Sequence, residues 1–206
     1  MTSRLRALTH GAIAMAALGL AFGACAQTSQ SSLAKEVDAS SSTTGKSFID
    51  LSIGKSAYRT SCGNVAGLTC SRGTTSYSLT GGNMLTENLG VELTAMNLGK
   101  ADRAGGSVVA RGINLSAVGR VPLGDSVAIE AKVGPTYGIT HVSAAQGAGL
   151  ARGRDSGFGL GYGVAMDLNL VRGLHGSIGW EQHDFHFVGQ GKSAVRNVTL
   201  ALGYSF

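Results

Sequence analysis

The sequence predicts an all-β protein, an eight-stranded antiparallel up-and-down transmembrane β-barrel. Three observations support this prediction. Glycine supplies 32 of the 206 residues, and the mean hydropathy is nevertheless positive. Beyond the N-terminal leader, no segment is long and apolar enough for a spanning helix, which needs ~20 such residues. The apolar residues instead alternate with small or polar ones, as they do in strands that face lipid on one side and a lumen on the other.

The N-terminus has the pattern of a cleaved secretory signal peptide, which we assign to residues 1–26. Two cations and no acid precede an apolar run from about Gly11 to Ala24, and Ala24-Cys25-Ala26 fits the small-residue rule for cleavage. The mature chain should begin at Gln27. A lipoprotein acylated on Cys25 is the alternative, but the aliphatic residue expected three places before that cysteine is missing. In both cases the protein leaves the cytoplasm.

Residues 27–46 are rich in Ser, Thr and Gln and contain few apolar residues, so they cannot bury enough surface to offset their ordering entropy. We expect a flexible periplasmic segment there. The barrel is predicted over residues 47–206. Eight alternating segments divide it, near 47–58, 74–84, 89–96, 107–119, 127–134, 157–168, 174–182 and 197–206.

The sixth segment is the clearest, because large apolar residues from Phe158 to Leu168 are separated mainly by glycines. The second is the weakest. In the seventh, the alternation weakens beyond Gln182, which suggests a bulge. Ten strands would also fit the length, but the loops contain no further alternating run. Eight is therefore the predicted number.

The connection lengths favour the same topology, since outer-membrane barrels have short periplasmic turns and longer external loops. The connections around 59–73, 100–106, 141–155 and 188–193 form the longer set, and the turns near 86, 123 and 172 form the shorter set. An even number of strands then places both ends of the barrel in the periplasm.

The last segment ends in an alternating strand closed by a terminal aromatic residue. Its apolar face comprises Val198, Leu200, Leu202, Tyr204 and Phe206. This ending resembles the signature that the barrel-assembly machinery reads in bacterial outer-membrane proteins. Together with the opening Ser47-Phe-Ile-Asp-Leu-Ser-Ile-Gly54, it makes residues 47–206 similar to the OmpA-like transmembrane domain and related small eight-stranded barrels. The resemblance implies the cell outer membrane, but it does not name an activity.

Five charged residues fall at the alternate strand positions that we assign to the lumen face, and we expect them to form a lumen polar network. They are Asp50, Glu92, Glu130, Lys132 and Glu181. Side chains nearly fill an eight-stranded barrel, so buried charges there need partners. A hydrogen-bonded plug of ion pairs satisfies that need. The alternative is a narrow polar path for ions or small solutes, which the inward glycines and the excess of acids favour. Glycines equally suit a strongly curved sheet.

Four cations have outward parity at the predicted external ends of their strands: Lys55, Arg111, Arg154 and Arg196. They could reach the outer rim and pair with phosphates of lipopolysaccharide. They could equally be solubilising charges at loop ends. Nucleic acid is not an expected partner, because the protein is exported and its cations are dispersed.

Candidate catalytic residues are few. His175-Gly-Ser177 with Glu181 matches the residue types of outer-membrane lipid A deacylases, in which a histidine activates a serine. Here these residues have inward parity near the periplasmic end, whereas that family attacks lipid from the outward side. His183 and His186 fall on opposite faces of a strand, so no metal site is predicted. We predict no cofactor and no enzymatic activity.

Two cysteines remain in the mature chain, Cys62 and Cys70, within a Gly/Ser/Thr-rich stretch. In an oxidising compartment this spacing predicts a disulfide that closes a surface loop. Such a loop is a protease-resistant turn or a contact for a host or surface ligand.

The sequence thus predicts an outer-membrane barrel with a structural, envelope-integrity or surface-interaction role. A low-conductance channel is the alternative, and a lipid-modifying enzyme is a distant third.

Overall fold

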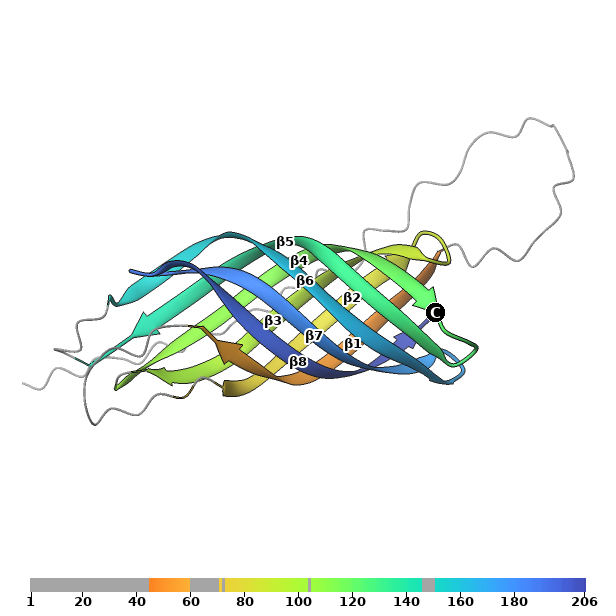
Figure 1. Ribbon diagram of the computed structural model, residues 1–206, viewed down its shortest axis with the longest axis horizontal. Coiled ribbons are helices and arrows are strands. Elements are labelled where there is room, and N and C mark those ends of the chain that lie inside the picture. Colours follow the sequence, from red (N-terminus) through yellow and green to blue (C-terminus); the bar gives the residue numbers. More distant parts are fainter. Residues whose placement is uncertain (1–44, 60–70, 72, 104, 146–150) are drawn as a thin grey trace, which may run out of the picture. The chain divides into compact units, whose positions relative to one another are not determined.

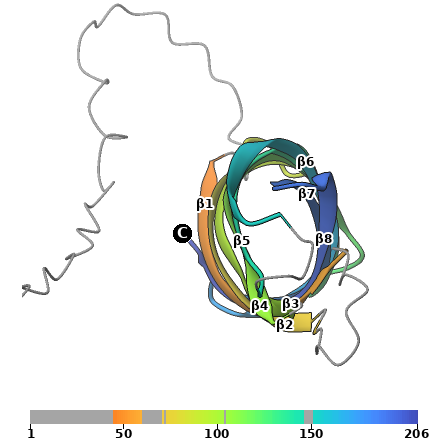
Figure 2. The ribbon, with the colours of Figure 1, turned by 90° about the vertical axis from the view of Figure 1, so that its left-hand side faces the viewer.

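The computed structural model describes residues 45–59, 71, 73–103, 105–145 and 151–206, and these form a closed antiparallel β-barrel (Figures 1 and 2). Eight strands follow one another around the barrel in chain order, as predicted. They are β1 (Lys46–Tyr58), β2 (Gly73–Met84), β3 (Leu89–Arg103), β4 (Gly106–Pro122), β5 (Val127–Ser143), β6 (Gly153–Val171), β7 (Leu174–Phe187) and β8 (Gly191–Ser205). The predicted signal peptide lies outside the described residues, as does all but the end of the predicted flexible segment.

The first and last strands close the barrel. β1 pairs with β8 from Phe48 opposite Ser205 to Tyr58 opposite Val195. Beyond that ladder, Ser47 and Phe206 exchange both backbone hydrogen bonds, with N···O distances of 3.1 and 2.9 Å. Closure leaves no strand edge at this seam, which a chain crossing a bilayer requires because lipid offers the backbone no hydrogen bonds.

The alternation seen in the sequence separates an apolar exterior from the lumen. Leu51, Leu79 and Leu200 are each at least half exposed on the outer wall, whereas their neighbours Ser52, Ser78 and Thr199 are buried inside. A belt of exposed aliphatic and aromatic side chains is the surface that meets lipid in a membrane barrel. Within the described residues, no helix is long and apolar enough to cross a membrane.

The two ends of the barrel differ in their connections. Short turns at residues 85–88, 123–126 and 172–173 lie at one end, the turn end, together with the C-terminus (Figure 1). Residues 59–72 and 144–152 connect strands at the other, the loop end. The prediction of four long connections there is wrong in two cases, because only residues 104–105 join β3 to β4 and only 188–190 join β7 to β8.

A β-bulge accounts for the first of these differences. The register between β3 and β4 shifts between Asn97 and Lys100, and Gly99 there has a φ of 77°. The extra residue reverses the inward and outward parity, so the continuation of β3 to Arg103 does not read as one alternating strand.

The bulge suggested beyond Gln182 is absent. β7 pairs with β8 in one unbroken register from Leu174 opposite Tyr204 to Phe187 opposite Gly191. The alternation weakens in the sequence because Phe185 and Phe187 face the lumen, where the pattern of a membrane barrel predicts polar or small residues.

Candidate functional site

The lumen is divided into three layers along the barrel axis. A polar cavity opens at the turn end, an ion-pair layer crosses the middle, and an apolar plug fills the loop end. Each layer is built from the inward residues of several strands, because successive side chains of a strand alternate between the two faces. The layers decide whether a solute could pass through the barrel.

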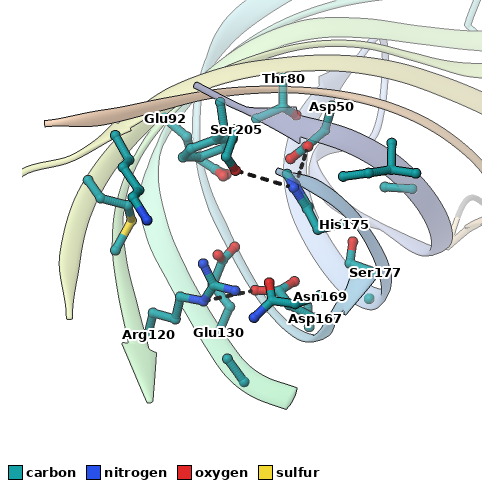
Figure 3. A pocket seen from close by; sticks show the side chains of 18 of the residues that line it. Asp50, Thr80, Glu92, Arg120, Glu130, Asp167, Asn169, His175, Ser177 and Ser205 are labelled. Carbon is teal, nitrogen blue, oxygen red and sulfur yellow. Dashed lines mark hydrogen bonds and ion pairs between the residues drawn. The ribbon is translucent and has the colours of Figure 1, made fainter. Parts of the chain in front are cut away.

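The turn-end cavity has a volume of about 460 Å³. In Figure 3, Asp50 of β1, His175 of β7 and Ser205 of β8 point toward one another across its wall. His175 Nε2 lies 2.7 Å from Asp50 Oδ1, and His175 Nδ1 lies 3.3 Å from the Ser205 hydroxyl. The imidazole thus joins three strands near the point where the barrel closes.

A second charged pair lines the cavity. Arg120 of β4 places its Nε 3.5 Å from Asp167 Oδ2 of β6 (Figure 3). Glu130 of β5 faces the same cavity, but among the described residues no ion pair or hydrogen bond joins its carboxyl to another side chain. The cavity therefore holds more acidic than basic groups at this level.

The ion-pair layer centres on Lys132 of β5. Its ammonium lies 2.6 Å from Glu181 Oε1 of β7 and 2.9 Å from Glu92 Oε1 of β3. Glu92 is 97% buried, so its charge depends on this partner. The layer ties together three strands that are not neighbours in the barrel.

Hydrogen bonds extend the layer to the wall. His183 Nε2 lies 3.4 Å from Glu181 Oε2, and its Nδ1 lies 3.0 Å from the Thr136 hydroxyl. The side-chain amide of Asn114 donates to that same hydroxyl at 2.9 Å. These buried polar groups are satisfied by one another, which is what a filled lumen requires.

The apolar plug fills the loop end of the lumen. Phe185, Phe187 and Val195 are fully buried, and Tyr58 is 2% exposed. Tyr58 and Phe187 pack edge to face with ring centroids 6.3 Å apart. The Tyr58 hydroxyl donates to the Gly99 carbonyl at 2.8 Å and accepts from the Ala110 amide at 3.1 Å. The other members of the plug are Met96, Leu98, Ala101, Val108, Ala110 and Val142.

The plug exists because β7 turns toward the lumen at the loop end, the end that faces the viewer in Figure 2. Pairing between β6 and β7 stops at Gly161 opposite His183, although both strands continue beyond that pair. The Thr140 hydroxyl of β5 donates to the carbonyl of His186 on β7, although β6 lies between these two strands in the order of the barrel. β7 thus passes on the lumen side of β6.

The inward glycines make this path possible. A Cβ added at Gly159 would overlap the carbonyl oxygen of Asp184, and one added at Gly138 would overlap the ring of Phe185. A Cβ at Gly157 would lie 2.8 Å from the His186 ring. These glycines therefore provide space for β7 and its aromatic side chains, and they do not line an open path.

His175 does not activate Ser177 in this arrangement, because its two nitrogens face Asp50 and Ser205. Ser205 is the serine that contacts the imidazole of His175, on the side opposite the Asp50 carboxylate. This arrangement of serine, histidine and aspartate resembles a hydrolase triad. However, the amide of Ser205 donates to the Gly173 carbonyl at 2.8 Å, and that of Phe206 donates to Ser47. The two backbone donors next to the hydroxyl are thus committed to the sheet and cannot stabilise an oxyanion.

The four predicted rim cations face outward in the loop-end halves of β1, β4, β6 and β8. Lys55, Arg111 and Arg154 are exposed, while Arg196 is half-buried and donates from Nε to Gln182 Oε1 at 3.0 Å. The five residues of the predicted assembly signature, Val198 to Phe206, are each at least half exposed on the outer wall. Cys62 and Cys70 lie outside the described residues.

The charged side chains of the predicted lumen network lie inside the barrel, together with several partners that the sequence did not single out. Arg120, Asp167 and His183 were not among the predicted site residues, although their inward parity was available as a signal. Phe185 and Phe187 were missed because the lumen was expected to be polar.

A closed barrel of eight strands with an apolar belt and a lumen filled by side chains defines the class of small outer-membrane β-barrels. The chain belongs to the family of the outer membrane protein beta-barrel domain, whose model matches residues 12–206. The protein therefore resides in the cell outer membrane. No characterised protein sequence matches it significantly.

Solved structures show the same fold at low sequence identity. Ail, the attachment invasion locus protein of Yersinia pestis, is 16% identical with a TM-score of 0.54, and the match covers 80% of this chain and 100% of Ail. Neisserial surface protein A is 11% identical with a TM-score of 0.59, covering 80% and 99%. OprG from Pseudomonas aeruginosa is 16% identical with a TM-score of 0.57, covering 79% and 96%.

Proposed function

We propose that the protein is a closed, non-enzymatic outer-membrane barrel that contributes to envelope integrity and presents its loop end for surface interactions. The apolar plug is the observation that carries this proposal. Phe185 and Phe187 are fully buried in the lumen at the loop end, where they belong to a cluster of ten buried apolar residues in the described part of the chain. An ion crossing this layer would exchange its hydration shell for largely apolar side chains, which is costly.

Single-channel conductance of the refolded mature protein in planar bilayers tests the proposal. Folding is checked first, by the shift in gel mobility that boiling causes in a compact barrel. A folded barrel should show no reproducible conductance. Conductance steps from the unaltered protein would contradict the closed-barrel proposal.

A low-conductance channel is the second candidate, and the turn-end cavity favours it. The cavity is polar and opens at one end, and it is lined by Asp167 and by Glu130, whose carboxyl has no ion pair in the part of the chain that the structure describes. If the lumen conducts, Glu130→Lys should alter the conductance and its preference for cations. A silent Glu130→Lys variant that folds as the unaltered protein does would favour the closed barrel.

We expect most partners of the barrel to bind at its loop end. Short turns are periplasmic and longer loops extracellular in such barrels, so the loop end faces outward. Lys55, Arg111, Arg154 and Arg196 then lie where the phosphates of lipopolysaccharide are available. During insertion, the outward-facing last strand would meet the barrel-assembly machinery.

A surface ligand at the loops also fits this orientation. Ail, which shares the fold, has been solved in complex with the heparin analogue sucrose octasulfate. Exposed cations at this chain's loop end could bind a sulfated glycan in the same chemical manner. Binding of sucrose octasulfate to the refolded barrel, measured by calorimetry at two salt concentrations, would test this.

A further inference from the structure

The outer wall of the barrel carries a hollow across β1, β2, β3, β4 and β5, with a volume of about 510 Å³. It follows one register row, in which Leu51, Leu79, Ala95, Ile113 and Tyr137 stand opposite one another in turn. Ala95 is the small member of that row. The side chains of Leu79 and Ile113 on either side form the walls, so the hollow is a groove over β3.

The loop-end side of the groove carries polar groups. Tyr77, Asn97 and Arg111 stand in the next outward row toward the loop end, beside the apolar Ile139, and all four line the same hollow. Asn97 Oδ1 accepts the Gly99 amide at 3.1 Å, so the group that this side chain can offer to a ligand is its NH₂ donor. Arg111 is exposed and adds a guanidinium.

The β-bulge in β3 adds a second cation at this end. Because the register shifts between Asn97 and Lys100, Lys100 lies outside the barrel opposite Val109. Without the extra residue, Lys100 would have inward parity and would meet the apolar plug. Lys100 and Arg111 are diagonal neighbours across two paired strands, a separation that long side chains can span.

We propose that this groove binds lipid A, with an acyl chain over Ala95 and a phosphate held by Arg111, Lys100 and the Asn97 amide. A groove with an apolar floor and a cationic end matches a phosphorylated, acylated lipid lying along the wall. The loop end faces the outer leaflet, where lipopolysaccharide supplies such phosphates. The inference rests on the proposed orientation and on the proposed contact of rim cations with lipopolysaccharide. It restricts that contact to one groove on the outer wall.

The barrel offers matched variants. Arg111→Ala removes one of the two cations at the groove's loop end, and Lys192→Ala removes an exposed cation at the loop end of β8, outside the proposed contact, as its control. Ala95→Leu fills the groove, and Ala131→Leu enlarges an exposed alanine on the outer wall of β5 as its control. All four side chains lie outside the lumen, so each variant should fold, as boiling and gel mobility would verify.

The measurement is retention of bisphosphorylated lipid A by the full-length barrel, quantified by native mass spectrometry in detergent. Loss of a charge-assisted phosphate contact should reduce retention about tenfold in Arg111→Ala, and Ala95→Leu should reduce it comparably. Both controls should retain lipid A. Phosphatidylglycerol at equal concentration should displace little of it.

Three results would overturn the proposal. Equal retention of lipid A in the Arg111→Ala and Lys192→Ala variants would show that only the general positive charge of the rim attracts the lipid. Unchanged retention of lipid A by Ala95→Leu would show that the groove over Ala95 does not bind the acyl chain. Equal displacement by phosphatidylglycerol would indicate a general contact with anionic lipid. None of these results depends on conductance, so failure of this site and failure of the closed-barrel proposal are distinguishable.

Discussion

Lys132 and Glu181 form an ion pair inside the barrel, with the ammonium nitrogen 2.6 Å from a carboxylate oxygen. Lys132 comes from β5 and Glu181 from β7, so the pair crosses the lumen past the intervening β6. Glu92 of β3 joins the same ammonium. These contacts connect strands that share no backbone hydrogen bonds with one another. The side chains in the lumen therefore help to fix the distances between opposite walls of the barrel.

Lys132→Met should strongly destabilise the barrel, because it leaves the carboxylates of Glu92 and Glu181 buried without a cation. Removing one partner of a buried pair costs roughly 3–5 kcal/mol. The free energy of unfolding in urea, measured in lipid vesicles, checks this. Lys55→Met on the outer wall is the control and should cost far less. Similar losses in both variants would show that the layer contributes little.

Phe185→Ala should open the loop end of the lumen. Phe185 is fully buried and reaches Gly138 of β5, so truncation removes one of the two phenylalanine rings from the plug. A stability loss of about 3–5 kcal/mol is expected, together with conductance steps in planar bilayers. Phe158→Ala, on the outer wall, should remain silent. A folded but silent Phe185→Ala barrel would place the barrier to ions in the ion-pair layer.

Gly159→Ala should displace the loop end of β7. The added Cβ would overlap the carbonyl oxygen of Asp184, which is backbone and cannot move cheaply. Overpacking of this kind typically costs about 1–3 kcal/mol. In Gly81→Ala, by contrast, the nearest atom to the added Cβ is 4.0 Å away, so that variant should unfold like the unaltered protein. Equal stability of the two variants would contradict the inward path of β7.

The number and order of strands could be predicted from the sequence because lipid imposes a rule on one face of every strand. Where that rule holds, as from Leu89 to Met96, prediction and structure agree. It fails at Gly99, where an extra residue reverses parity, and at Phe185, where an apolar residue faces inward. Both features lie at the loop end, so the strands there were predicted too short.

The contents of the lumen could be predicted only in part. Parity shows that Lys132, Glu92 and Glu181 face inward, but which inward side chains meet depends on the register of strands that are not neighbours. A single strand's sequence does not contain that information. The same limit explains why the partnership of Asp50 with His175 was not predicted, although both residues were placed inside.

Deletion of Phe206 should impair assembly more than Phe206→Ala does. Deletion removes two contributions. The backbone of Phe206 exchanges hydrogen bonds with Ser47 at the closing seam, and the residue, 72% exposed, presents its ring on the outer wall. The alanine variant keeps the backbone pair and loses only the aromatic ring. If the ring is an assembly signal, Phe206→Ala alone should lower the yield of heat-modifiable barrel in cell membranes. It should also leave unaided refolding in detergent unchanged, because the ring packs on no buried core. If both variants fail equally in both settings, Phe206 acts through barrel closure, and the recognition role assigned to the last strand is wrong.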